Sequence, residues 1–306
     1  MKTKRVDSIE EFAIHMSLMC DHYLGQGINK PIHLYHYTSN SAKCKMLSRD
    51  SVKLKFSRAR LFLDKNEGVH ILEPFHYACG KLFNSGTIDS DFYSEMKKIN
   101  CSSVLKAVKE QVWIISFSKN GYSYYMKERY APADGWILTF NALLADLCLE
   151  SENDAPRFSL TSVLYSFSKM SKILERLLKK LYSAYCADSN NTKKRLSLCR
   201  KCFTNILSSI CYSYKSSVYE AEEEVRLIAY LPKNFKAWES EDHRVSLFLS
   251  AEDKSENLYL SFDRNLCINE TQSPEPVESS RFNTRIMSSK DIAMAYKKAT
   301  MQIYPK

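Results

Sequence analysis

The sequence predicts an α+β fold. Short runs rich in β-branched and aromatic residues, typical of buried strands, occur both before and after a block of helical patterns. Strands and helices that alternated regularly would indicate a doubly wound parallel sheet, whereas segregated blocks favour α+β. The 306 residues are 44% hydrophobic and 26% charged, which is typical of a globular protein and excludes an intrinsically disordered chain. We expect one domain over residues 1–306.

The N-terminal half begins with an amphipathic helix and continues into strands. Ser8, followed by Glu11, forms a capping box before apolar residues at helical spacing, and Gly25 supplies the stop. Apolar and aromatic runs then predict strands, and periodic segments between them predict helices. Strands are expected at residues 31–39, 111–118 and 135–141, and residues 52–63 are expected to hold one or two strands. The expected helices are 41–47 and 71–83, and residues 85–107 are expected to form a loop and a helix.

A basic helical hairpin is expected in the second half. Apolar residues recur at helical spacing from Phe167 to Tyr185 and from Cys199 to Tyr214. Residues 166–215 contain 11 basic and 2 acidic side chains, so their net charge equals the +9 of the whole chain. We interpret 166–215 as an insertion whose basic face is either a solvated surface or a site for an acidic partner, nucleic acid or an anionic membrane. Strands at 159–165, 224–231, 244–249, 258–263 and 284–287 and a helix at 289–301 complete the expected elements.

The cysteines and the missing motifs exclude several classes of protein. The 10 cysteines lack the spacing of a disulfide framework and are expected to be reduced and mostly buried. The one close pair, Cys199 and Cys202, falls in a helical apolar stripe, so we expect core residues and no metal site. The chain has no P-loop, dinucleotide glycine fingerprint or Gly-x-Ser-x-Gly elbow. No apolar run suits a membrane helix or a Sec signal peptide.

An acidic segment is the strongest candidate site. Glu220, Glu222, Glu223 and Glu224 directly precede an apolar run that predicts a buried strand. Residues two apart on a strand face the same side, so Glu222 and Glu224 are expected to share one face, with Glu220 in the same register and Glu223 opposite. The alternative is a charged loop that keeps a sheet edge hydrated.

Several short motifs occur in a fixed order between residues 34 and 230. They are Tyr35-His36-Tyr37-Thr38-Ser39, Asp64 with Glu67, Phe117-Ser118, Met126 with Tyr130-Ala131, Gly135 and Phe140, Val163-x-Tyr165, and Glu222-x-Glu224-x-Arg226. This order resembles a widespread bacterial domain family catalogued without a function. The strand end and the late Glu-x-Glu are also similar to ADP-ribosyltransferases, in particular to CteC-type effectors, which attach ADP-ribose to a threonine of ubiquitin. The sequence departs from the family pattern at Leu63, Lys65, Lys127 and Asn141.

The resemblance implies a fold, a co-substrate and a setting. It implies an ADP-ribosyltransferase-like split β-sheet core and an NAD-dependent mono-ADP-ribosyltransferase that modifies a host protein, with ubiquitin as one candidate. It further implies a bacterial virulence effector delivered into the host cytoplasm, by type III secretion, or else a protein of the bacterial cytoplasm. On this interpretation neither a membrane span nor a nucleic-acid partner is expected. Two alternatives are a non-enzymatic module that binds through the basic hairpin and a defence toxin that cleaves NAD.

Transferase chemistry assigns roles to the candidate residues. Cleavage of the nicotinamide–ribose bond passes through an oxocarbenium-like transition state, which a fixed carboxylate stabilises. We assign that role to Glu224, with Glu222 as base or acceptor-orienting group. Glu220 is the substitute for Glu224. Asp64 is either catalytic or a turn residue, and Arg226 is a possible ion-pair partner for it. The residues expected to hold NAD are His36, Tyr37, Thr38, Arg58, Arg60, Ser118, Tyr124, Tyr125 and Tyr130.

Overall fold

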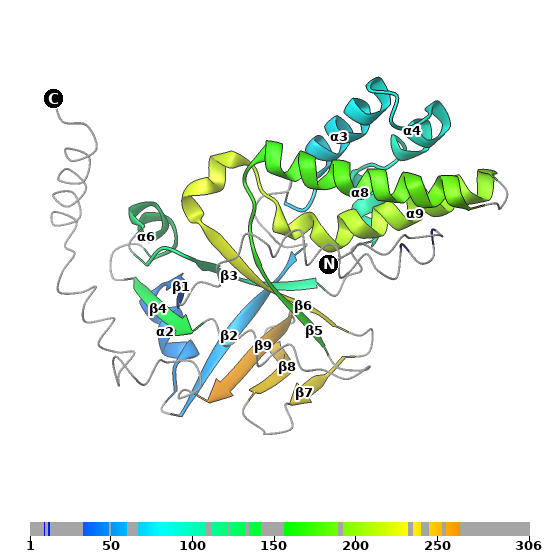
Figure 1. The fold of residues 1–306 in the computed structure, drawn as a ribbon. Coiled ribbons are helices and arrows are strands. Elements are labelled where there is room, and N and C mark those ends of the chain that lie inside the picture. Colours follow the sequence, from blue (N-terminus) through cyan, green and yellow to red (C-terminus); the bar gives the residue numbers. More distant parts are fainter. Residues whose placement is uncertain are drawn as a thin grey trace, which may run out of the picture. The chain divides into compact units, whose positions relative to one another are not determined.

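The protein combines helices with an antiparallel sheet, which confirms the α+β class (Figure 1). The computed structural model describes residues 9, 12, 33–48, 50–59, 67–107, 112–121, 123–131, 135–141, 156–188, 192–231, 235–239, 245–252 and 255–263. The chain divides into two compact units, of which the first comprises residues 1–29, 58–112 and 161–220, and the second comprises 30–57, 113–160 and 221–306. The single domain expected over residues 1–306 stays a prediction.

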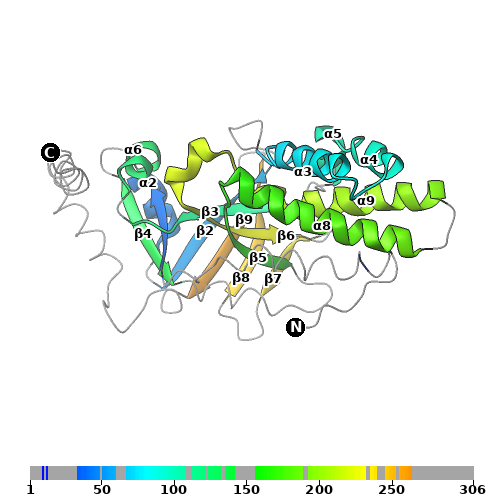
Figure 2. The same cartoon turned by 45° about the horizontal axis from the view of Figure 1, so that its top comes forward.

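The first unit is built from helices. They are α3 (Leu72–Asn84), α4 (Ser90–Met96), α5 (Cys101–Ala107), α8 (Phe167–Ala187) and α9 (Thr192–Ile210), followed by the 3₁₀ turn η2 (Cys211–Ser213). The pair α8 and α9 is the expected helical hairpin, and the segment expected as a loop and one helix contains both α4 and α5. Helix α3 packs on α8, while α4 and α5 pack on α9 (Figure 2). Within this bundle Phe75 stacks on Phe203 with ring centroids 5.3 Å apart.

The cysteines of α9 belong to the core, as their spacing predicted. Cys199 and Cys202 are 0% and 7% exposed, and burial raises the pKa of Cys199 to about 12 and that of Cys202 to about 11. Both thiols are therefore protonated at neutral pH. Of the seven cysteines described, four are buried, in line with the expectation of mostly buried thiols, and three, Cys44, Cys101 and Cys186, are exposed. The described residues contain no cluster of His, Cys, Asp and Glu suited to a metal ion.

The second unit holds most of a nine-stranded sheet. The strands are β1 (His33–Thr38), β2 (Ser51–Arg58), β3 (Val112–Ser118), β4 (Trp136–Asn141), β5 (Arg157–Ser162), β6 (Glu224–Tyr230), β7 (Ala237–Glu239), β8 (Val245–Glu252) and β9 (Ser255–Asp263). Their order is β4-β1-β3-β2-β9-β8-β7, and β6 pairs with β3 and β5 outside this order. The sheet therefore branches at β3.

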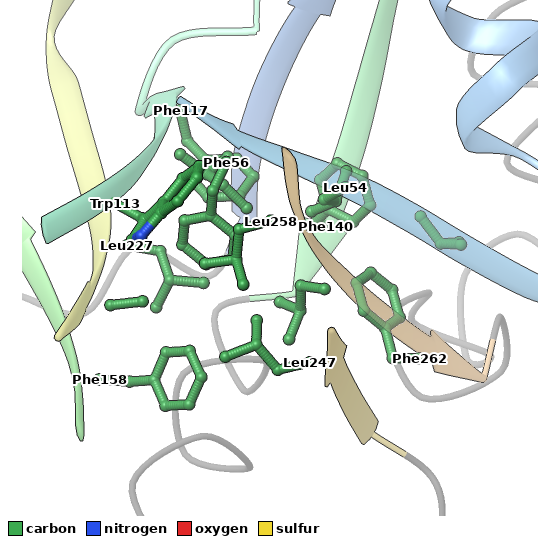
Figure 3. Close-up of a cluster of buried hydrophobic side chains, with 14 of the residues drawn as sticks. Leu54, Phe56, Trp113, Phe117, Phe140, Phe158, Leu227, Leu247, Leu258 and Phe262 are labelled. Carbon is green, nitrogen blue, oxygen red and sulfur yellow. The ribbon is translucent and has the colours of Figure 1, made fainter. Parts of the chain in front are cut away.

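Alternation along the strands separates a core face from an opposite face. Trp113, Ile115 and Phe117 of β3 pack with Val225 and Leu227 of β6 in one apolar cluster. Figure 3 shows Leu54 and Phe56 of β2 and Leu258 of β9 in the same cluster. Because successive side chains of a strand point to opposite faces, the intervening residues of β3 and β6 lie on the other side of the sheet.

Two short helices are associated with the strands of this unit. Helix α2 (Asn40–Met46) follows β1, and α6 (Tyr124–Tyr130) follows β3. Ser39 and Ser123 cap them, since each hydroxyl oxygen accepts a hydrogen bond from a backbone amide of the first turn. Neither α6 nor β7 was predicted from the sequence.

Several expected elements cannot be compared with the structure. The N-terminal helix, apart from the buried residues Ile9 and Phe12, lies outside the described residues, as do the strand expected at 284–287 and the helix expected at 289–301. Among the described residues, no helix combines the length and the apolar character needed to cross a membrane.

Candidate functional site

The candidate site lies on the face of β3 and β6 opposite the core cluster. Ser116 and Ser118 alternate with the core residues of β3, and Glu224 and Arg226 alternate with those of β6. All four side chains therefore belong to one face of the sheet. Tyr35 is the register partner of Ser118, which places Tyr35 on this face as well.

Glu224 is held in a buried ion pair. Arg226 donates from Nε to Oε1 at 2.8 Å and from Nη2 to Oε2 at 2.9 Å, and Ser116 Oγ also donates to Oε1. Glu224 is 4% exposed and Arg226 is 1% exposed. Both carboxylate oxygens are thus engaged, and the guanidinium balances the negative charge. Glu224 therefore has a structural role in the site, and we do not assign it a contact with the substrate.

Glu222 belongs to the same region, but it does not lie on the strand as expected. Residues Ser217–Glu222 form the 3₁₀ helix η3, and the strand begins only at Glu224, so strand alternation does not relate the two carboxylates. Between them Glu223 has φ of 44°, in the left-handed region. Ser118 Oγ donates to the Glu222 carbonyl at 2.9 Å, and the Lys119 amide donates to the Glu223 carbonyl at 3.0 Å. These bonds fix the turn, and Glu222 is 2% exposed.

Glu220 does not share this position. It is exposed, whereas Glu222 is buried. In a 3₁₀ helix side chains three apart line up, so residues two apart point in different directions. The expectation that Glu220 shares the strand register of Glu222 and Glu224 is therefore wrong. Glu223 is also exposed, and its Oε1 accepts a hydrogen bond from Asn120 Nδ2 at 3.3 Å.

Tyr130 connects the buried Glu222 to the protein surface. Its phenol donates to Glu222 Oε1 at 2.9 Å, although Tyr130 itself is 40% exposed. Burial raises the pKa of Tyr130, and the charge of Glu222 raises it further, so the phenol keeps its proton at neutral pH. The last turn of α6 thus fixes the orientation of this carboxylate.

Arg129 is a candidate residue that the sequence did not indicate. Its Nη1 donates to Tyr125 Oη at 2.5 Å, and its guanidinium carbon lies 5.7 Å from the Tyr125 ring and 5.8 Å from the Tyr130 ring. A cation, two phenols and the carboxylate of Glu222 are therefore gathered along α6. The only available signal was the density of tyrosines in this segment, because its helical conformation was not predicted.

Tyr37 anchors the loop that leads from β3 to α6. Its phenol donates to the Asn120 carbonyl at 2.6 Å and accepts from the Ser123 amide at 3.0 Å. Burial raises the pKa of Tyr37 to about 12. Gly121 lets this loop approach the sheet, since a Cβ there would lie 2.5 Å from Cε1 of Tyr35. Tyr37 therefore positions the loop through the two hydrogen bonds of its hydroxyl.

His36 and Thr38 lie on the core face of β1. The His36 ring meets Phe117 edge-on at 5.8 Å, and Nδ1 is 2.9 Å from the Ser116 carbonyl. Burial lowers the pKa of His36, so a neutral ring donates to that carbonyl. Thr38 Oγ1 donates to the sulfur of Met46 at 3.8 Å. The structure does not bring these two expected cofactor ligands to the pair formed by Glu222 and Tyr130.

The other predicted residues divide between structural contacts and undescribed positions. Ser118 is fully buried and serves the turn at Glu222. Tyr124 is 43% exposed, and its phenol donates to Glu128. Arg58 ends β2, at the boundary of the helical unit. Arg60 and Asp64 lie outside the described residues, and the side chain proposed as a partner of Asp64, that of Arg226, binds Glu224.

Comparison of the chain with known proteins gave no relationship on which to build. No family model matches it, and searches of characterised proteins and of solved structures found no match.

Proposed function

We propose that the protein is an NAD-dependent mono-ADP-ribosyltransferase in which Glu222 is the carboxylate that faces the substrate. The observation that carries this proposal is the hydrogen bond from the partly exposed Tyr130 to the buried Glu222, beside the ion pair of Glu224 with Arg226. The branch of the sheet at β3 supports a split sheet of the ADP-ribosyltransferase kind. The catalytic role assigned to Glu224 from the sequence is thereby moved to Glu222, and Glu224 receives a structural role.

The charge balance of the two carboxylates is the reason for this reassignment. Stabilising an oxocarbenium-like transition state requires a fixed negative charge. A cation paired directly with that charge weakens the field that the transition state experiences. The charge of Glu224 is offset by a bidentate guanidinium, whereas Glu222 accepts a hydrogen bond from a neutral phenol and interacts electrostatically with Arg129. Because of the bidentate pairing of Glu224, we assign stabilisation of the developing positive charge to Glu222.

The groups along α6 fit the chemistry of NAD. When bound, NAD would supply the ADP-ribosyl group, as nicotinamide leaves with the electrons of its ribose bond and the acceptor oxygen bonds to the ribose and loses its proton. Tyr125 and Tyr130 offer aromatic rings for a planar heterocycle, and Arg129 offers a cation for the pyrophosphate. We keep the wider setting as part of the proposal: a bacterial effector in the host cytoplasm, with a ubiquitin threonine as the first acceptor to test.

Labelled NAD tests the assignment. The protein is incubated with NAD carrying ³²P in the adenylate and with ubiquitin or host-cell lysate, and labelled protein is measured. We expect Glu222→Gln to lower labelling by about 10²- to 10³-fold, the usual effect of removing one transition-state contact. Glu220→Gln is the matched control, because it makes the same change at an exposed carboxylate two residues away and should keep full activity.

Three outcomes separate the alternatives. Labelling by Glu222→Gln equal to that of the unsubstituted protein would show that Glu222 is not the catalytic carboxylate. Release of nicotinamide without labelled protein would favour an NAD-cleaving toxin. Neither labelled protein nor released nicotinamide from the unsubstituted chain would contradict an NAD-using enzyme altogether.

A further inference from the structure

Helix α8 carries a row of exposed cations along one face. Lys169, Lys172, Arg176 and Lys179 are all exposed, and their spacing of three, four and three residues brings them within an arc of about 80° around the helix axis. At 1.5 Å of rise per residue the row is about 15 Å long, with about 4.5 to 6 Å between neighbours. We call these four side chains the α8 cationic row.

The acidic residue of α8 does not cancel this row. Glu175 is 13% exposed at its side chain and accepts a hydrogen bond from Lys81 of α3 at 2.7 Å. Its charge is thus already balanced by a cation from another helix. The row therefore consists of four cationic side chains at exposed positions of a 21-residue helix that packs on α3 and α9.

We propose that the α8 cationic row binds the phosphate backbone of a nucleic acid without reading its sequence. Cations clustered along one face of a helix are the electrostatic footprint of nucleic-acid binding. Each strand of DNA carries one phosphate per about 3.4 Å of helix axis, so a row about 15 Å long can face several consecutive phosphates. Within the row the side chains are all Lys or Arg, which can bind phosphates of any sequence. This differs from the expectation, drawn from the resemblance, that no nucleic acid is bound.

Two other anionic partners fit the row less well. A protein interface is depleted in lysine and built around buried aromatic or apolar anchors, and three of these four residues are lysines. A membrane-bound amphipathic helix inserts its apolar face into the lipid. On α8 that face is already used in the bundle, since these apolar side chains are 0% exposed: Met170, Leu174, Leu177 and Leu181.

Salt-dependent binding of a DNA duplex tests the proposal. Fluorescence anisotropy of a labelled mixed-sequence duplex of 20 base pairs is measured between 50 and 200 mM KCl. We compare the unsubstituted protein with a row variant, Lys169→Gln/Lys172→Gln/Arg176→Gln/Lys179→Gln. The control variant removes the same number of charges at scattered exposed lysines and is Lys45→Gln/Lys55→Gln/Lys106→Gln/Lys236→Gln.

The expected result follows from counterion release. Losing four phosphate contacts should reduce the slope of log K against log salt by about 3 to 4 and weaken binding at 100 mM salt by more than roughly tenfold. The control variant should stay within about threefold of the unsubstituted protein. Glutamine keeps the helix propensity of the exposed positions, and circular dichroism of each variant confirms that the helices persist.

Any of three results would overturn the proposal. The first is no binding of the duplex by the unsubstituted protein at 50 mM salt. The second is an equal loss in the row and control variants, which would show that net charge alone matters. The third is displacement of the duplex by polyglutamate or by phosphatidylserine vesicles as effectively as by unlabelled duplex, which would indicate an acidic protein or a membrane instead. None of these results depends on Glu222, so the transferase proposal is tested separately.

Discussion

Removing Arg226 should leave a buried charge without its main partner. In Arg226→Met, Glu224 keeps the hydrogen bond from Ser116 but loses both guanidinium contacts, at a position where the carboxylate is only 4% exposed. Breaking a buried pair on one side typically costs about 3 to 5 kcal/mol. Because whole domains are stable by only about 5 to 15 kcal/mol, this single substitution should bring the second unit close to unfolding at 25 °C.

Replacing both partners should cost much less than replacing one. In Glu224→Leu/Arg226→Met no charge is left buried, and apolar replacements of buried ion pairs are often neutral or even stabilising. The assay is urea unfolding followed by tryptophan fluorescence, since Trp113 lies in the adjacent core and is 3% exposed. Ser116→Ala serves as the milder control, because it removes one hydrogen bond to a charged group and should cost about 1.5 to 3 kcal/mol.

The double-mutant cycle gives a clear test of this reasoning. We expect a coupling free energy of about 2 kcal/mol or more between positions 224 and 226. If the double variant were as unstable as the sum of the two single variants, the two side chains would not act as a pair. The structural role that we assign to Glu224 would then be wrong.

Three further predictions concern the same face and its neighbours. Gly121→Ala should destabilise the protein by about 1 to 3 kcal/mol, because the new methyl group overlaps Tyr35. Gly80→Ala should instead stabilise α3 slightly, because its methyl group would point into open space. Thermal unfolding compares the two variants. Since the pKa of Tyr37 is raised to about 12, stability should fall between about pH 10 and pH 12, where the unfolded tyrosine ionises first, and Tyr37→Phe should flatten that fall in urea titrations. The pKa of His36 is lowered, so its contribution is present above pH 6.5 and is lost as the pH falls below it, and unfolding of His36→Gln should be less sensitive to acid between pH 7 and pH 5.

The elements with strong local patterns were predictable from the sequence. The apolar runs of β3 and β6 and the periodic leucines of α8 predicted these elements because each pattern is contained within its own segment. Helix α6 escaped prediction, because its seven residues include three tyrosines, which favour strands, and its main helical signal is the cap at Ser123. Tertiary contacts outweighed the propensity of that segment.

The arrangement of the candidate site was less predictable than its composition. The acidic segment correctly marked two carboxylates that are buried, but it could not show which one is neutralised. The conformation of Glu222 depends on the hydroxyl of Ser118, and its orientation depends on the phenol of Tyr130, and both belong to distant segments. Likewise, only the register of β1 with β3 reveals that the face of Tyr35 and Tyr37, and not that of His36, is the face of Ser118.

The hydrogen bonds around the carboxylates also set when the site can form during folding. The bonds from Tyr130, Ser118 and Ser116 to Glu222 and Glu224 join residues separated by 92, 104 and 108 positions in the chain. Closing a loop of this length costs on the order of 4 kcal/mol of chain entropy, which the contacts formed afterwards must offset. Such long-range contacts also slow folding. A nascent chain that has emerged only as far as α9 contains the hydroxyl groups of Ser116, Ser118 and Tyr130 and neither glutamate. The carboxylate pair is therefore completed late, after synthesis has passed the whole helical hairpin.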